Sequence, residues 1–430
     1  MALTSGSQLK NPLGTSLALV LFILTLIPFG LGSALILSGY IYTPMVRWGG
    51  YELSWTLFGL IFVVAAAFKI GSPLMQIRSL SRTDTLAIAM VCFVLVFSSV
   101  VFAPLTSFAL YYSATLAIAA LVGLSSARLA ADIGMKYVRA VCLALFGGIL
   151  LHSLVVFWFM FLERGNSDLG WAQFAAPSFT NMRHYNFSLE IAVVLAAGLF
   201  ASTPSPRWAR PLIFIGACIL WSLLFWTGAR GAILAIIVSF AITMAIVPAM
   251  LRLFLSFSIT SAAIGAIISL IYWLPDSRFG VFNIAARTID AQSANQLSSS
   301  RMQMWTEAVN LISNNPLFGY GPGQFAFLTN IQSFKINLHP HNAALDMLLS
   351  VGVIGTIFLI FLLVKLWFKV TIQTRITHPP LTIAIFWAVN SLITHSMLAG
   401  SLFVVHSRIS FAILIGILVA GRISKAGNSH

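Results

Sequence analysis

The segment LHPHNAALDMLLSVGVIGTIFL, residues 338–359, places polar side chains directly before an apolar run. A histidine near its ordinary pKa can take a proton from a hydroxyl or hold one beside a developing oxyanion, and His339 and His341 both lie here. Asp346 follows His341 by just over one helical turn, where it could help to orient the ring. A helix cap accounts for Asn342 but not for two histidines, so catalysis and simple capping both stay open.

Arginines are the second group of candidates, because the planar guanidinium suits bidentate contacts with phosphate. Arg230 stands between two apolar runs in FWTGARGAIL, where Gly228 and Gly231 leave room for a ligand. An arginine at the membrane centre costs about 2.5–3.5 kcal/mol on insertion scales. The plainer interpretation of Arg230 is a turn residue whose side chain reaches to the membrane surface.

Other candidate residues also lie at the ends of apolar runs. Arg183 precedes such a run beside His184, and Arg408 follows His406 at the start of another. Glu190 is a lone carboxylate inside its run, and we expect it to pair with an arginine in a structural role.

The elements that position these residues are membrane helices. The 430 residues are 59% hydrophobic and 8% charged, with a mean hydropathy of +0.96. Apolar runs of about 20 residues, the length that crosses a bilayer, recur along the chain and do not alternate as barrel strands do. We therefore expect an all-α polytopic membrane protein with about twelve spans, at 15–38, 53–70, 84–103, 105–123, 138–161, 187–203, 210–226, 231–249, 252–274, 343–368, 380–399 and 404–422.

The distribution of charge predicts the orientation. Most of the 24 lysines and arginines fall in the connections on the side of the two termini, which predicts that both termini are cytoplasmic. This orientation places nine spans in residues 1–274, a large outer loop at 275–342, and three spans in residues 343–430. The net charge of +14 includes no basic block, so we expect membrane lipids as partners and no nucleic acid.

Two parts of the large loop have a recognisable pattern. An amphipathic helix is expected near 301–313, headed by Arg301, with Met302 and Trp305 on an apolar stripe that continues through Val309 and Ile312 at the membrane interface. The glycine-rich segment PLFGYGPGQF either presents backbone N–H groups to an anion or simply bends the chain.

Several kinds of site are absent from the sequence. It contains no phosphate-binding P-loop, no GxSxG, no HExxH and no pair of outer carboxylates at the spacing of a divalent-metal site. The three cysteines lie inside apolar runs without a CxxC pattern. We therefore expect no metal and no cofactor, and a substrate that brings its own leaving group.

Three motifs resemble the O-antigen ligase/polymerase superfamily. They are the Arg230–Gly231 pair, the PLFGYGPGQF segment, and HN-x9-G-x2-G at His341, Asn342, Gly352 and Gly355, which is closest to the O-antigen ligase family. The twelve-span layout with a large loop between the ninth and tenth spans is also similar to that family.

The resemblance implies a glycosyltransferase of the GT-C type in the inner membrane of a Gram-negative bacterium. It implies inverting, metal-independent transfer of O-antigen glycan from undecaprenyl pyrophosphate to a sugar hydroxyl of lipid A–core, at a periplasmic active site. By motif, His341 matches the family's loop-exit histidine, Arg230 and Arg301 match its arginines, and Arg183 matches more loosely. Asn342, His339, Asp346 and Arg408 are then expected to support the site.

Other functions remain open. An O-antigen polymerase would use an undecaprenyl-linked glycan as acceptor, and a protein O-oligosaccharyltransferase would use a protein. A transporter or flippase of an anionic lipid belongs to a different class, and it predicts charges along a midplane path and internal repeats.

Overall fold

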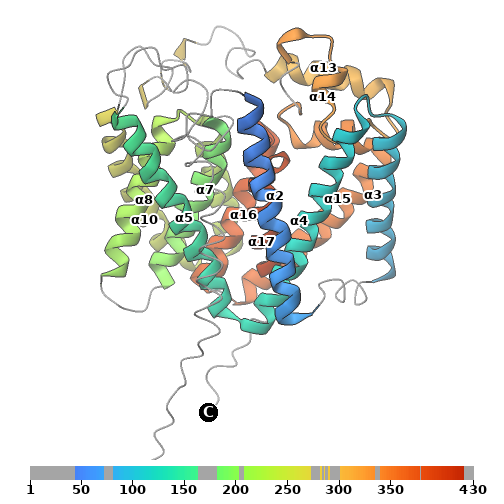
Figure 1. Ribbon diagram of the computed structural model, residues 1–430. Helices are drawn as coiled ribbons and strands as arrows, with labels where there is room; N and C mark the ends of the chain where they lie inside the picture. Colours follow the sequence, from blue (N-terminus) through green and yellow to red (C-terminus); the bar gives the residue numbers. More distant parts are fainter. Residues whose placement is uncertain are drawn as a thin grey trace, which may run out of the picture.

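The computed structural model describes residues 44–71, 81–162, 182–202, 208–272, 281–282, 285, 289–290, 301–334, 339–377 and 379–420. Within these residues every regular element is a helix (Figure 1). The long helices are α2 (Pro44–Ile70), α3 (Arg82–Val101), α4 (Thr106–Ile133), α5 (Met135–Leu162), α7 (Met182–Ser202), α8 (Ala209–Trp226), α9 (Arg230–Ile246), α10 (Leu251–Ser269), α13 (Arg301–Asn314), α15 (Ala343–Thr377), α16 (Pro380–Ala399) and α17 (Val405–Val419). Short turns are η3 (Pro248–Met250), η4 (Leu270–Tyr272), α14 (Phe325–Leu328), η5 (Gln332–Phe334) and η6 (Ser401–Phe403).

Among the described residues, eight helical segments are long and apolar enough to cross a membrane, and three shorter apolar helices lie at 53–68, 230–246 and 405–419. These findings confirm a polytopic all-α membrane protein. The expected span at 15–38 lies outside the described residues, and each of the other expected spans coincides with one of the helices. The count of twelve and the GT-C type stay predictions.

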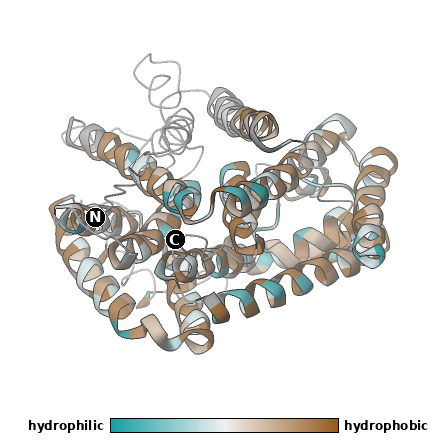
Figure 2. Ribbon diagram, turned by 90° about the horizontal axis from the view of Figure 1, so that it is seen from below, coloured by the Kyte–Doolittle hydropathy of each residue, from teal (hydrophilic) through white to brown (hydrophobic). Residues whose placement is uncertain are grey.

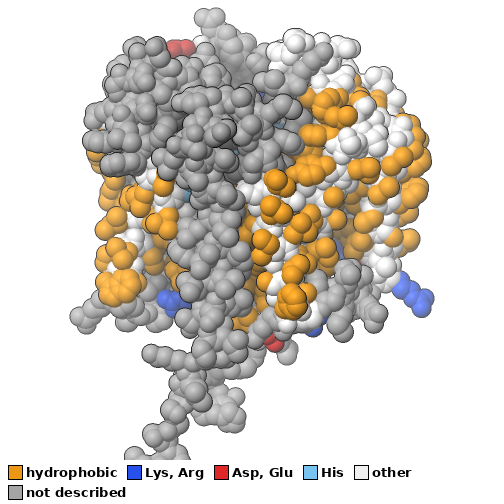
Figure 3. Space-filling view, viewed as in Figure 1, with side chains coloured by type: hydrophobic (Ala, Val, Ile, Leu, Met, Phe, Trp, Pro, Cys, Tyr) orange, Lys and Arg blue, Asp and Glu red, His pale blue; other side chains and the backbone are white. Residues whose placement is uncertain are grey.

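The molecule presents apolar side chains outward along the height of its helices. Figure 3 shows these side chains over most of the visible described surface, with lysine and arginine at its lower edge. Seen from below in Figure 2, the helices lie side by side with hydrophobic residues over much of their length. Such a surface suits lipid as a solvent.

Helices α7 and α16 form the centre of the bundle. They pack against each other, α16 also packs against α9, and α17 packs against α4. Most side chains of α7 and α16 are buried, in contrast to those of α3 and α10, few of which are. Polar side chains on α7 and α16 are therefore enclosed by protein, where they need partners within the protein.

Helix α15 is interrupted at Gly352, whose backbone (φ 60°, ψ −171°) is not helical. The interruption leaves carbonyl groups without their usual partners in the helix. Leu349 O instead accepts a hydrogen bond from Tyr320 N–H (2.7 Å), and Ser350 O accepts one from Gly321 N–H (2.9 Å). The glycine-rich segment thus replaces the missing turn of the helix.

The same segment also satisfies the donors beyond the interruption. Val353 N–H donates to Pro316 O (2.8 Å) and Ile354 N–H donates to Leu317 O (3.2 Å). Gly319 must be glycine here, because its φ is 68° and a Cβ would lie 2.6 Å from a carbonyl oxygen of α15. These contacts support the bend, and not anion binding, as the role of PLFGYGPGQF, since its N–H groups at 320 and 321 already bind α15.

Helix α13 lies at the upper end of the bundle in Figure 1 and packs against α15. It occupies the segment in which the amphipathic helix is expected, but it buries Met304 and Ala308 against Phe325 and Leu349. Met302 and Val309, two members of the expected stripe, are 45% and 53% exposed. The helix therefore packs one apolar face against the protein, while a second set of apolar side chains stays exposed.

Candidate functional site

The candidate site is organised around the last turn of α16. This helix ends at Gly400, whose left-handed conformation (φ 69°, ψ 36°) is typical of a helix C-terminus. The carbonyl groups of the last turn have no N–H partner within the helix. Two of them instead contact the His-Pro-His-Asn segment. His341 Nδ1 lies 3.2 Å from Ala399 O, and Asn342 Nδ2 donates to Met397 O at 3.1 Å.

The contact with Ala399 determines which nitrogen of His341 can act as a base. A carbonyl oxygen only accepts hydrogen bonds, so the neutral ring carries its proton on Nδ1. Nε2 then holds the lone pair, as a proton acceptor requires. The backbone of His341 has a φ of 54°, which is uncommon outside glycine and is often found at functional sites.

His339 packs against His341 and the end of α16. The two rings are perpendicular with centroids 4.7 Å apart, and a Cβ on Gly400 would lie 2.9 Å from His339 Nδ1. Burial, together with the positive charge of Arg408, lowers the pKa of His339 to about 4. His339 is therefore a neutral ring that supports His341 at neutral pH.

Asn342 and Asp346 have structural contacts. Asn342 Oδ1 accepts a hydrogen bond from Leu345 N–H at 3.1 Å, so Asn342 caps α15. Asp346 is 2% exposed, and its Oδ1 has no hydrogen-bond partner among the described residues. Orientation of His341 by Asp346, which the spacing suggested, therefore does not involve this oxygen.

Arg408 braces the turn that follows α16. It is 6% exposed, and it donates to Leu402 O (3.1 Å), Phe403 O (2.7 Å) and Thr115 Oγ1 (2.6 Å). These bonds tie η6 to α4 and α17. The side chain is thus enclosed and supports the turn next to Gly400.

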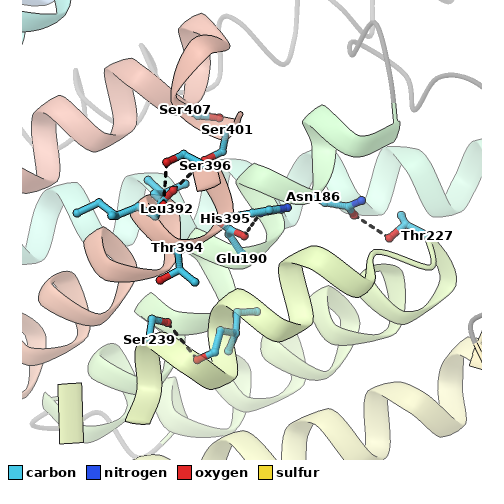
Figure 4. Close-up of polar contacts among 12 residues, drawn as sticks. Asn186, Glu190, Thr227, Ser239, Leu392, Thr394, His395, Ser396, Ser401 and Ser407 are labelled. Atoms are coloured by element: carbon cyan, nitrogen blue, oxygen red, sulfur yellow. Dashed lines mark hydrogen bonds and ion pairs between the residues drawn. The ribbon is translucent and has the colours of Figure 1, made fainter. Parts of the chain in front are cut away.

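Arg230 begins α9 after a tight turn. Gly228 has a φ of 69° and its carbonyl accepts from Arg230 N–H (3.0 Å). Thr227 Oγ1 donates to Asn186 Oδ1 of α7 at 2.7 Å, which fixes the turn to the centre of the bundle (Figure 4). The cap residue of α9 makes no side-chain hydrogen bond, and Arg230 itself is half-buried.

A buried acid–histidine pair lies beside this turn. His395 Nδ1 of α16 lies 2.5 Å from Glu190 Oε2 of α7, and both side chains are enclosed (Figure 4). The expected pairing of Glu190 with an arginine is therefore wrong. Our sequence reasoning missed His395, although each residue is an ionisable group inside an apolar run, a pattern that indicates a partner.

The structure gives fewer contacts for the other two candidate arginines, Arg183 and Arg301. The backbone of Arg183 lies in the first turn of α7, and its side chain lies outside the described part. Arg301 begins α13 and is half-buried. One turn along α13, Trp305 Nε1 donates to Pro340 O (3.1 Å) instead of facing lipid headgroups, which ties the helix to the His-Pro-His segment.

The structure therefore brings His339, His341 and Asn342 to the last turn of α16, with Arg408 and the start of α13 nearby. His395, one turn earlier on α16, links the same helix to the Arg230 turn. Within the described ranges, no group of three or more His, Cys, Asp or Glu side chains is arranged to hold a metal ion.

One family model matches part of the chain. Residues 215–360 match the family model described as O-antigen ligase, which confirms the resemblance that the motifs indicate. The matched stretch contains Arg230, Arg301, His341 and Asn342. A search of curated proteins found no match. The family implies, in general, a glycosyl-transferring enzyme of the bacterial inner membrane that uses a polyprenyl-linked glycan and a lipid acceptor.

Proposed function

From the match of residues 215–360 to the O-antigen ligase family, we propose that this protein is a metal-independent, inverting glycosyltransferase. It transfers O-antigen glycan from undecaprenyl pyrophosphate to a sugar hydroxyl of lipid A–core on the periplasmic face. The observation that carries the proposal is the position of His341: its Nδ1 contacts Ala399 O, on the helix whose preceding turn supports the Arg230–Gly231 turn.

In the proposed reaction His341 acts on the acceptor. Nε2 takes the proton of the sugar hydroxyl as the oxygen attacks C1 of the donor glycan. The new C1–O bond forms while the bond from C1 to the pyrophosphate oxygen breaks, and the leaving group departs with its electron pair. Attack from the face opposite the leaving group inverts the anomeric centre.

The departing pyrophosphate requires positive charge. Arg230 supplies a guanidinium at the start of α9, where the first N–H groups of the helix also favour an anion. Arg301 and Arg183 are proposed as further donor-binding residues. Fixed cations of this kind stabilise charge that develops in the transition state, which makes a metal ion unnecessary in this mechanism.

The proposed orientation places the loop side of the bundle in the periplasm and both termini in the cytoplasm. The exposed apolar side chains of α13, Met302 and Val309, then face the outer membrane–water interface. Both substrates carry lipid tails, so they reach the site from within the bilayer.

A reconstituted reaction tests the proposal. Purified protein is incubated with undecaprenyl-pyrophosphate-linked glycan and lipid A–core, with and without EDTA. We expect transfer that survives chelation and that falls about 10²–10⁴-fold in His341→Ala, the usual contribution of general acid–base catalysis. Transfer by Arg230→Ala is expected to fall by a similar factor, whereas Lys365→Met, in the half of α15 away from His341, serves as the control.

Three outcomes would contradict parts of the proposal. Loss of transfer in EDTA would show that a metal ion is needed. Unchanged product with His341→Ala would remove this residue from catalysis. Transfer only to an undecaprenyl-linked glycan would identify a polymerase instead of a ligase.

A further inference from the structure

Glycine at position 231 has no conformational explanation. Gly231 lies in the first turn of α9 and is not among the glycines with positive φ. The structure gives a spatial reason instead, because a Cβ at this position would lie 3.3 Å from Nε2 and 3.6 Å from Cδ2 of His395. The turn that carries Arg230 therefore packs directly on the His395 ring.

The ring of His395 is itself held from two sides by α7. Its Nδ1 bonds to Glu190 Oε2 (2.5 Å), and the Phe187 ring meets it edge-on with centroids 4.8 Å apart. Phe187 and Glu190 are three residues apart, so they lie on the same face of α7. The ring has little freedom to rotate, and its Nε2 edge faces Gly231.

Enclosing this pair is unfavourable unless it has a role. Glu190 is fully buried, and its second oxygen, Oε1, has no hydrogen-bond partner within the described part of the chain. An unsatisfied buried polar atom is destabilising, because it has lost its hydrogen bonds to water without replacing them. A hydrocarbon pair of similar shape would fill the same space without this loss, so stability does not explain the pair.

We propose that Glu190 and His395 form a positioning pair for Arg230. Glu190 fixes the ring of His395, the ring fixes Gly231, and Gly231 sets the position of the Arg230 guanidinium relative to His341. The same segment of α16 contacts both proposed catalytic residues or their turns. His395 packs against the turn that carries Arg230, and Ala399, one helical turn later, contacts His341. The inference rests on the proposed transfer reaction and adds to it two residues that need not touch the substrate.

Glu190→Gln tests the pair with little change of shape. A glutamine amide can donate to Nδ1, which favours the tautomer with the proton on Nε2 and alters the contact with Gly231. We expect kcat to fall by about 10²-fold, within the range of effects seen for misplaced catalytic groups, while KM for lipid A–core stays the same. His395→Asn is expected to act in the same way, and Gly231→Ala should do so by placing a methyl group against the ring.

Two controls separate positioning from general loss of stability. Asn390→Leu removes a buried hydrogen bond of the same helix, the 3.0 Å bond from Trp367 Nε1, and Gly59→Ala places a Cβ 3.0 Å from two side-chain ends elsewhere in the bundle. Both are expected to lower the midpoint of thermal unfolding as much as Glu190→Gln does, without its loss of kcat.

A double-mutant cycle gives the decisive readout. If Glu190 acts through Arg230, then Glu190→Gln has a much smaller effect on kcat in an Arg230→Lys background than in the wild type. Equal effects in the two backgrounds would overturn the inference and leave the proposed function intact. Full activity of Glu190→Gln would also overturn it alone, whereas an inactive wild type would overturn the proposed function and this inference together.

Discussion

His339 and His341 lie two residues apart and have different surroundings, from which their different proposed roles arise. His341 is half-exposed and has its Nδ1 next to a backbone carbonyl, which leaves Nε2 for the proton of the acceptor in the proposed reaction. His339 lies between Gly400, Phe403 and the His341 ring, and its buried Nδ1 has no partner in the described structure. A neutral His339 keeps a second positive charge away from the Arg408 region.

His339 predicts a loss of stability in acid. Its pKa is lowered to about 4 in the folded protein, from the ordinary value of 6.5, so the unfolded chain binds more protons between these values. Stability is therefore fully present above pH 6.5 and decreases as the pH falls toward 4. We expect His339→Gln to remove part of this decrease, on the order of 2 kcal/mol, measured as the unfolding midpoint between pH 7 and pH 4.5 in detergent. Parallel curves for the variant and the wild type would contradict this assignment.

At this scale the sequence predicted the histidines but not their contacts. The HN-x9-G-x2-G motif identified His341, and the helix start after Asn342 identified a cap. The partner of His341 is a backbone carbonyl 58 residues away, and every residue has a carbonyl, so no side-chain pattern reveals it. The spacing of His341 and Asp346 also suggested an interaction between them. The Oδ1 atom of Asp346 does not make it, because spacing along the chain does not determine where a buried side chain points.

The interrupted helix α15 is the main feature at the scale of single elements. Its apolar run predicts one continuous helix, because hydrophobic periodicity does not record where a hydrogen-bond ladder breaks. Gly355 allows close packing, since a Cβ there would lie 2.5 Å from Val351 Cβ of the same helix and 3.1 Å from Val94 of α3. Gly352 instead allows the backbone of the 316–321 segment to enter the ladder.

Gly352→Ala is therefore expected to be severely destabilising. Its φ and ψ fall in a region that is almost exclusive to glycine and costs about 1–3 kcal/mol for other residues, and a Cβ would overlap the backbone of Leu317. We expect a lower unfolding midpoint and loss of transfer activity. Gly59→Ala in α2 is the control with a smaller effect, because Gly59 has no positive φ and a Cβ there would meet only side-chain ends, at 3.0 Å. Equal effects of the two substitutions would refute the explanation.

For the whole molecule, the sequence predicted the class of fold well because lipid restricts the possibilities. A chain with recurrent runs of about 20 apolar residues must form helices that satisfy their own backbone. The pairing of α7 with α16, and hence of Glu190 with His395, depends on which helices are neighbours. Packing between segments about 200 residues apart determines which helices are neighbours, and the hydropathy of the sequence does not predict it.

The orientation in the membrane is tested by cysteine accessibility. Asn310 on α13 and Arg375 near the end of α15 are both exposed and lie at opposite ends of the bundle. In a background without Cys92, Cys142 and Cys218, we expect Asn310→Cys to react with a membrane-impermeant maleimide in intact spheroplasts. Arg375→Cys should react only after permeabilisation, and the reverse pattern would invert the proposed topology.

The four backbone hydrogen bonds between α15 and the 316–321 segment have a consequence for how this protein can change. This part of the loop is not an appendage that can be exchanged between relatives, because removing it would leave a gap of unpaired amides in the middle of a transmembrane helix. Diversification for new sugars is therefore expected to proceed around this junction, with the two stretches inherited together as a unit.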